Sequence, residues 1–383
     1  MSAFAIAGAR LFDGDALHHG RVVLVADGRI RAVLPEAECP AGTPVHRVAG
    51  LLAPGFVDIQ VNGGGGVLLN DRPTVDGVRT IAEAHRRFGT TGMLPTLVTD
   101  TRERMAEAIA AVRAALAEGV PGILGIHLEG PYLNPERKGV HDPRLMRRIE
   151  EEDIALVGSL GVGRTLITIA PELTTPEVIG RIAGSGVLIA AGHTTASYEV
   201  MMAARAAGLT GVTHLFNAMP PLMGREPSVI GAALDDQGLW PSLIVDLFHA
   251  AVPSLRVALA ARGFARTILV TDAMSTVGTD MDSFMLGDRV ITRAGGRLTT
   301  ADGTLAGSDL DMATAVRNAV EALGLPLEAA LHMASRAPAE FLGLGGELGR
   351  IAPGYRASLV LLDDGLRVTE TWIDGVSSER ASA

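Results

Sequence analysis

A single cysteine, Cys39, stands in a chain of 383 residues. One thiol cannot form an internal disulfide, and it excludes a zinc site built from several thiolates. No uninterrupted apolar stretch approaches the ~18 residues that a membrane-spanning helix needs. The opening residues, Met1–Gly14, lack the basic and long apolar segments of a signal peptide. These absences favour a protein of the reducing cytoplasm.

A surplus of positive charge is also missing. The formal net charge is −10, the sequence pI is about 5.5, and the basic residues form no stripe. Nucleic acid is therefore not an expected partner, because its binding depends on clustered Lys and Arg. The sequence shows no fixed-period repeat and no low-complexity segment, and its hydrophobic share of 48% is sufficient for a large buried core.

Short strand patterns separated by turn residues occupy both ends of the chain. At the N-terminal end the expected strands are Ala3–Phe12, Arg21–Ala26, Arg29–Leu34 and Val45–Leu51. At the C-terminal end they are Ser358–Leu362 and Val368–Ile373. Dipeptides such as Asp13-Gly14 provide the turn chemistry between them. We predict one small β-sandwich domain formed by residues 1–52 together with residues 347–383.

The segment from residue 53 to residue 346 alternates strand-like apolar runs with Ala-rich helical patterns. The expected strands are Gly55–Val61, Met93–Val98, Ile123–Glu129, Leu166–Ala170, Val187–His193, Val212–Leu215, Leu243–Phe248 and Thr267–Asp272. The clearest helical patterns are Val75–Phe88, Glu103–Glu118 and Tyr198–Ala207. This alternation favours an α/β fold of the (β/α)₈ TIM-barrel type, and an open doubly wound sheet is the alternative.

Three side chains that can bind a metal ion stand where predicted strands stop. Glu129, His193 and His214 follow apolar runs on the strands expected to be third, fifth and sixth. The ends of parallel barrel strands lie on one face, so these residues could converge. Such a ligand set suits a catalytic zinc or similar ion, which makes water ionise near neutral pH. A lone His is more often a hydrogen-bonded core residue, but the three together favour a metal site.

Asp272 ends the eighth predicted strand, where a carboxylate could take a proton from water and return it to a leaving nitrogen. The alternative is a helix N-cap, because Asp-Ala-Met-Ser can open a helix. His127 lies two residues before Glu129 and faces the same way along a strand. It is expected deeper in the barrel, packed against the site rather than bound to metal.

Other candidates depend on position alone. His141 and His249 follow the third and seventh predicted strands and could contact substrate, although structural roles are nearly as probable from spacing. Arg225 is the best candidate to pair with a phosphate, and an exposed surface arginine is the alternative. His85 is expected on an exposed helix face. The glycine run 63–66 lacks the Gly-Lys-Ser/Thr of a P-loop and is expected to be flexible backbone beside the site.

Several motifs together resemble the amidohydrolase superfamily. Two of them, near the first strand and near the end of the chain, are Pro54-Gly55-Phe56-Val57-Asp58 and Ile351-Ala352-Pro353-Gly354. Others resemble more narrowly the N-acetylglucosamine-6-phosphate deacetylases within it. They are His127-Leu128-Glu129-Gly130-Pro131-Tyr132, Gly192-His193-Thr194, Thr213-His214-Leu215-Phe216-Asn217, Gly224-Arg225-Glu226-Pro227 and Leu305-Ala306-Gly307-Ser308. The likeness covers essentially the whole chain.

The resemblance implies a reaction and a ligand set. The reaction is hydrolysis of the acetamide of N-acetylglucosamine 6-phosphate to glucosamine 6-phosphate and acetate by metal-activated water. One divalent ion per subunit, Zn²⁺ or else Fe, Mn or Co, would be held by Glu129, His193 and His214. Asp272 would be the general base and acid, and His141 would contact the reacting acetamide.

The resemblance also implies how the substrate is held. The sugar phosphate would be contacted by Asn217, Ala218 and His249. Arg225 matches an arginine that reaches into the neighbouring subunit's site, which implies a homodimer. N-acetylgalactosamine 6-phosphate stays open as the substrate, because one hydroxyl's orientation is read by loop geometry.

Residues 60–62, Gln-Val-Asn, stand where most superfamily members have His-x-His, so a second metal ion is not expected. A cyclic amidase would usually carry a carboxylated lysine on the fourth strand, and residues 166–172 contain none. The missing histidines would also fit a catalytically inactive scaffold. The complete Glu-His-His-Asp set argues against that alternative.

Overall fold

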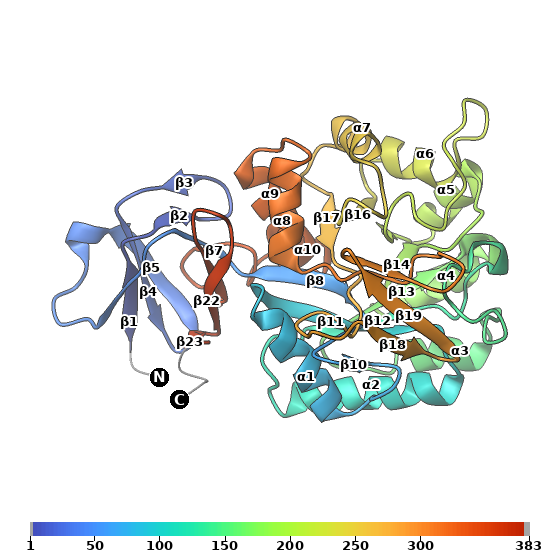
Figure 1. Cartoon of the computed structure of the whole chain (residues 1–383), viewed down its shortest axis with the longest axis horizontal. Coiled ribbons are helices and arrows are strands. Elements are labelled where there is room, and N and C mark those ends of the chain that lie inside the picture. The colour runs from blue at the N-terminus through green and yellow to red at the C-terminus, as the bar shows by residue number, and fades with distance from the viewer. Residues whose placement is uncertain (1–2, 379–383) are drawn as a thin grey trace.

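The computed structural model describes residues 3–378, and a barrel of parallel strands forms its larger part (Figure 1). The barrel strands, in chain order, are β8 (Phe56–Val61), β11 (Thr90–Val98), β12 (Gly125–Glu129), β13 (Arg164–Ile169), β14 (Leu188–Ala191), β15 (Gly211–Val212), β16 (Trp240–Ile244) and β17 (Ile268–Val270). Each strand pairs in parallel with the one before it.

The first and eighth strands meet just beyond β17. The backbone N–H of Asp272 donates to the carbonyl of Gln60 at 2.9 Å, and that of Asn62 donates to the carbonyl of Ala273 at 2.9 Å. These bonds close the sheet into a ring. The predicted TIM-type barrel is therefore confirmed, and the open doubly wound sheet is wrong.

Helices surround the barrel strands (Figure 1). They are α1 (Val75–Arg86), α2 (Arg102–Ala117), α3 (Glu151–Val157), α4 (Pro176–Gly184), α5 (Tyr198–Ala206), α6 (Ser228–Asp235), α7 (Val252–Arg262), α8 (Met312–Glu321), α9 (Leu327–Ala334) and α10 (Arg336–Phe341). Short 3₁₀ turns lie at Glu36–Glu38, Pro135–Arg137 and Pro171–Leu173. None of the helices in residues 3–378 has the length and apolar character needed to cross a membrane.

Hydroxyl side chains fix where several of these helices begin. Thr74, Thr101, Thr175 and Ser197 each accept a hydrogen bond from a backbone N–H in the first turn of α1, α2, α4 and α5. Such a cap satisfies an N–H that has no partner within the helix, and it stabilises by about 1 kcal/mol. The caps thus mark the points at which the chain leaves the loops of the barrel mouth and enters the outer layer.

A two-sheet β-sandwich lies beside the barrel (Figure 1). One sheet contains β5 (Arg29–Pro35), β4 (Arg21–Ala26), β1 (Phe4–Ala7) and β6 (Val45–Arg47) in that order. The other contains β23 (Val376–Ser377), β22 (Val368–Ile373), β21 (Leu359–Leu362), β7 (Leu51–Pro54), β2 (Arg10–Phe12) and β3 (Leu17–His18). Strands from both parts of the chain share the second sheet, as the small β domain predicted from both chain ends requires.

Two of the predicted N-terminal strands are each divided at a glycine. Ala3–Phe12 breaks at Gly8 (φ +97°). In Val45–Leu51, β6 ends at Arg47 and β7 begins at Leu51, directly after Gly50 (φ +107°). A Cβ on Gly8 would lie 2.6 Å from the carbonyl oxygen of Val48, and one on Gly50 would lie 2.2 Å from that of Leu362. Only glycine fits such close backbone approach with positive φ. The two halves therefore cross from one sheet to the other, which strand periodicity could not indicate.

A three-stranded antiparallel sheet follows the eighth barrel strand, and sequence patterns predicted no strand there. It consists of β18 (Ser283–Leu286), β19 (Arg289–Ala294) and β20 (Arg297–Thr299). Its buried side chains Phe284, Ile291 and Leu298 pack with Met274, two residues beyond Asp272. The sheet, called the flap below, thus lies against one side of the barrel mouth.

The glycine run forms a hydrogen-bonded hairpin of β9 (Gly63–Gly64) and β10 (Val67–Leu68), held also by bonds from Gly65 and Gly66 to carbonyls of residues 275 and 277. His85 supports it from α1, with Nε2 2.8 Å from the carbonyl oxygen of Gly63. The prediction of an exposed His85 is wrong, since its side chain is fully buried. Burial lowers the pKa of His85, which keeps the imidazole neutral.

Trp372 is the largest fully buried side chain of the structure and fills the sandwich core. Trp372→Ala should lower the free energy of unfolding by about 3–5 kcal/mol, because it leaves a large cavity. Urea denaturation followed by circular dichroism measures this change. Val376→Ala is the matched control, because Val376 in the neighbouring strand is 39% exposed. Equal losses in the two variants would contradict the proposed core.

Candidate active site

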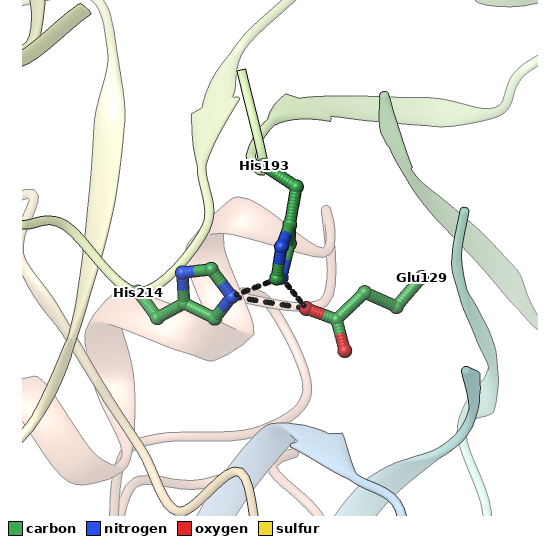
Figure 2. Close-up of side chains that lie close together, drawn as sticks. All are labelled: Glu129, His193 and His214. Carbon is green, nitrogen blue, oxygen red and sulfur yellow. Dashed lines mark hydrogen bonds and ion pairs between the residues drawn. The ribbon is translucent and has the colours of Figure 1, made fainter. Parts of the chain in front are cut away.

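Glu129, His193 and His214 converge at the mouth of the barrel (Figure 2). Glu129 is the last residue of β12, and the two histidines follow the ends of β14 and β15. Oε1 of Glu129 lies 3.0 Å from Nε2 of His214 and 3.4 Å from Nε2 of His193. The two imidazole nitrogens are 3.0 Å apart, and all three side chains are buried.

This cluster has the donor chemistry of a divalent-metal site. Nδ1 of His193 lies 2.8 Å from the carbonyl oxygen of Arg137, so it carries the hydrogen and leaves the Nε2 lone pair facing the cluster. Burial alone would raise the pKa of Glu129, but hydrogen bonds with His193 and His214 hold it well below its usual range. A carboxylate and two imidazoles that turn Nε2 toward one point fit zinc or a similar ion.

Several residues of the mouth hold the left-handed backbone conformation, which costs energy for a residue other than glycine. Among them are His193 (φ +49°), His214 (φ +34°) and Asp272 (φ +53°). Each stands just beyond a strand end, where a sharp turn aims the side chain across the barrel. Left-handed residues at three of the four strand ends mark the mouth as a functional site, and no sequence pattern had indicated this strain.

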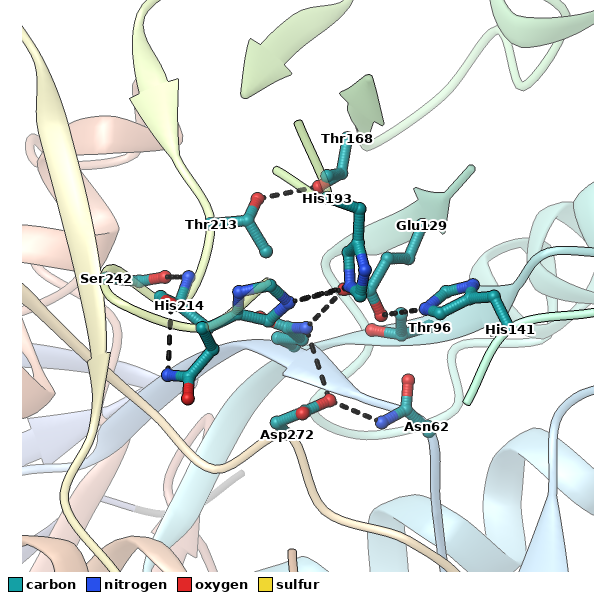
Figure 3. A network of polar contacts seen from close by, with 12 residues as sticks. Asn62, Thr96, Glu129, His141, Thr168, His193, Thr213, His214, Ser242 and Asp272 are labelled. Atoms are coloured by element: carbon teal, nitrogen blue, oxygen red, sulfur yellow. Dashed lines mark hydrogen bonds and ion pairs between the residues drawn. The ribbon is translucent and has the colours of Figure 1, made fainter. Parts of the chain in front are cut away.

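Two amide side chains at the end of the first strand donate to the carboxylates, and Figure 3 shows Asn62 beside Asp272. Nε2 of Gln60 donates to Oε1 of Glu129 at 3.0 Å and to Oδ1 of Asp272 at 3.2 Å. Nδ2 of Asn62 donates to the same Oδ1 at 2.7 Å. Both amides therefore turn N–H groups toward the carboxylates, and an N–H group has no lone pair to offer a metal ion.

Asp272 is buried beside this cluster, and it caps no helix. The next α-helix along the chain, α8, begins at residue 312, so the N-cap alternative is wrong. Burial, followed by the negative charge of Glu129, raises the pKa of Asp272 to about 7. Both hydrogen bonds from Gln60 and Asn62 end on Oδ1, and Oδ2 accepts neither of them.

His141 and His249 border the same cavity from two loops. Nε2 of His141 is 4.0 Å from Glu129, and its Nδ1 is 2.7 Å from the hydroxyl of Thr99. Burial and the nearby His193 lower the pKa of His141 to about 3. The backbone N–H of Thr99 points at Nδ1 from 3.4 Å, which favours a neutral ring with its hydrogen on Nε2, facing the site.

His249 is held by a neighbour that sequence patterns had not singled out. Its Nδ1 lies 2.6 Å from Asp246, which also accepts the backbone N–H groups of Phe248 and His249. Burial opposes a charged imidazole, yet the hydrogen bond and the charge of Asp246 raise the pKa of His249. An Asp just after a strand and three residues before a His is the available signal for such a pair.

A cavity of about 370 Å³ joins these side chains, and Asn217 and Ala218 lie in its wall. None of its lining residues in the described part of the chain is a lysine or an arginine. Arg225 is exposed in the loop before α6, outside this wall. His127 lies deeper, with Nε2 2.8 Å from the hydroxyl of Thr168, and it takes no part in the cluster.

Comparisons with known proteins agree with this geometry. The family model described as "Amidohydrolase family" matches residues 51–377. The chain is 43% identical to the N-acetylgalactosamine-6-phosphate deacetylase of a Shewanella species, over 96% of this chain and 94% of the relative. It is 34% identical to the N-acetylglucosamine-6-phosphate deacetylase of Haemophilus influenzae, over 92% and 93% respectively.

A solved structure is similar over nearly the full length. The crystal structure of N-acetylglucosamine-6-phosphate deacetylase from Pasteurella multocida superposes with a TM-score of 0.95 at 32% identity. The likeness covers 98% of this chain and all of that one. The barrel and its sandwich are thus shared as a unit.

Glu129→Gln should weaken the binding of Zn²⁺ and Mn²⁺ by about 100-fold or more, because it removes the only charge among the three donors of the cluster. Titration calorimetry, with metal content measured after dialysis, tests this expectation. His127→Asn is the control, because this buried histidine lies outside the cluster. Unchanged affinity in Glu129→Gln, or an equal loss in the control, would contradict the assignment.

Proposed function

Because this chain belongs to the amidohydrolase family, we propose that it hydrolyses the acetamide of N-acetylglucosamine 6-phosphate, yielding glucosamine 6-phosphate and acetate. The observation that carries the proposal is the convergence of Glu129, His193 and His214 opposite Asp272 in one cavity. The deacetylases that resemble the chain over nearly its full length support the substrate class. A charged sugar phosphate is retained inside cells, which suits a cytoplasmic location.

One divalent ion per chain would be held by Oε1 of Glu129 and by Nε2 of His193 and of His214. Zn²⁺ is the expected occupant, and Fe²⁺, Mn²⁺ and Co²⁺ suit the same donors. Such an ion, when bound, supplies a Lewis acid for the carbonyl and lowers the pKa of water. The amides of Gln60 and Asn62 leave no imidazole for a second ion on the first strand.

The protein's own groups perform the proton transfers. Asp272, through Oδ2, takes a proton from the attacking water and returns it to the nitrogen as the C–N bond breaks. Its Oδ1 stays fixed by Gln60 and Asn62, so the carboxylate keeps one orientation through both transfers. His141 donates from Nε2 to the oxygen that gains negative charge in the tetrahedral intermediate.

The substrate's sugar phosphate extends from the reacting amide toward Asn217, Ala218 and His249. A phosphate dianion needs cationic partners, yet no arginine or lysine of the described chain lines this cavity. The loop before α6 extends away from the barrel with Arg225 exposed (Figure 1). We therefore assign Arg225 to the neighbouring subunit's phosphate, within a homodimer.

Asp272→Asn should lower kcat by about 10³-fold or more while metal content stays unchanged, because an amide cannot accept and return the proton. Acetate release and elemental analysis measure the two quantities. Asp280→Asn, at an exposed position, is the control and should keep full activity. An active, metal-replete Asp272→Asn variant would contradict the role of Asp272 in proton transfer.

Phosphate recognition predicts that kcat/KM for the phosphorylated sugar exceeds that for N-acetylglucosamine by at least about tenfold, since charged hydrogen bonds are lost without phosphate. Arg225→Ala should reduce this ratio, whereas Arg148→Ala, another exposed arginine, should not. Equal kcat/KM values for the two wild-type substrates would contradict the proposed substrate class.

A second candidate substrate is N-acetylgalactosamine 6-phosphate. The 43% identity to a deacetylase with that name, against 34% to the Haemophilus influenzae enzyme, favours it specifically. Both epimers carry the same acetamide and phosphate, so the metal cluster and Asp272 serve either one. Acetate release from the two epimers at equal concentration decides between them, and release from neither would support an inactive scaffold.

A further inference from the structure

We propose that Val98 and Val140 form the wall that receives the methyl group of the substrate's acyl chain and restricts the enzyme to acetyl. This inference rests on the proposed function, and it adds the acyl specificity. The two valines are partly buried, and both line the cavity that contains the metal cluster. No catalytic step described above uses them.

The register of the barrel places Val98 beside the metal carboxylate. In the pairing of β11 with β12, Thr96 lies opposite His127 and Val98 lies opposite Glu129. The hydroxyl of Thr96 accepts a bond from Val61 N–H and lies 3.5 Å from His127, inside the barrel. Side chains two residues apart on a strand share a face, so Val98 also faces inward, one layer nearer the mouth.

Val140 reaches the same place from the loop after β12. It directly precedes His141, whose ring is fixed by Thr99, the residue after Val98. Gly139 precedes it and passes so close to His193 that an added Cβ would lie 3.3 Å from that ring. Val140 also packs against the buried residues of the flap, which fixes its position from behind.

The order of the strands separates this wall from the sugar-binding side. In a ring of eight strands, β11 is second and lies across from β15, which is sixth. Figure 3 shows Thr96 of β11 and His141 on the side away from His214 and Ser242. The loop after β15 carries Asn217 and Ala218, so the polar contacts for the sugar and the apolar wall lie on opposite sides.

The reacting carbon has three substituents, and two of them have defined directions. The oxygen faces the metal cluster and His141, and the nitrogen faces Asp272 on the eighth strand. The third substituent, the acyl methyl group, then points between the loop after the third strand and the first strand, toward Val98 and Val140. An acyl methyl placed there is buried against two apolar side chains, which suits a short hydrocarbon group.

A second cavity lies next to the two valines, so the size of their side chains determines how large an acyl group the site can hold. This second cavity of about 210 Å³ shares Val98, Val140 and His141 with the first, and Arg104 and Asp71 also line it. Val98, Val140 and His141 thus border both cavities. Shortening the valine side chains would extend the acyl pocket into existing space, with no need to move a strand.

The test compares kcat/KM for the N-acetyl, N-propionyl and N-butyryl forms of the 6-phosphorylated sugar. In the double variant Val98→Ala/Val140→Ala, the propionyl-to-acetyl ratio should rise at least tenfold over the wild type, because one methylene is worth about 10–200-fold in a fitted pocket. Leu305→Ala is the matched control, since Leu305 lines the same cavity from the loop after the flap, and its ratio should stay within twofold.

A metal-replete double variant that hydrolyses the acetyl substrate but keeps the wild-type propionyl-to-acetyl ratio would contradict the proposed role of the two valines. An equal rise in Leu305→Ala would do the same. If the double variant does not fold, Val140→Ile tests the converse, and the formyl-to-acetyl ratio should then increase. Failure of the proposed function would be recognised by a different result, because the wild type would then release no acid from any of these sugars.

Discussion

Oε1 of Glu129 is the atom on which the site depends. Nitrogens of His193, His214 and Gln60 approach it within 3.4 Å from the fifth, sixth and first strands. A carboxylate this deeply buried is costly unless it is paired, so the strands must present their partners at one level of the barrel. The same demand explains the left-handed residues at the strand ends, whose strain is offset by the contacts that they complete.

The amides of the first strand complement that arrangement. Two imidazoles in their place would offer lone pairs for a second cation. Gln60 and Asn62 instead donate hydrogen bonds, which fix Asp272 without neutralising its charge. Under the proposed function, the aspartate thus stays available to exchange protons. Gln60 and Asn62, which would also fit an inactive scaffold, here hold Asp272 in one orientation beside the Glu-His-His cluster.

Local patterns predicted the barrel and the residues at its mouth, because both follow from the apolar run of each strand and from the place where it stops. Glu129 required only one strand end to be located correctly. His85 shows the limit, since its burial depends on the hairpin of residues 63–68, and helix periodicity carries no information about that distant segment. The flap was missed for a related reason, because its short strands bury few side chains and pack against residues near Asp272.

Chemistry and selectivity occupy different parts of the molecule. Glu129, His193, His214 and Asp272 stand on or just beyond strand ends, where the paired strands of the barrel hold the backbone. The groups that would choose the sugar and the acyl chain stand mostly on longer loops, at Val140 and Asn217. Loops change without disturbing a barrel. Relatives at 43% and 34% identity can therefore bear the names of epimeric substrates while sharing one reaction. The epimer that this chain prefers is then expected to depend on these loops, because both epimers carry the same acetamide and phosphate.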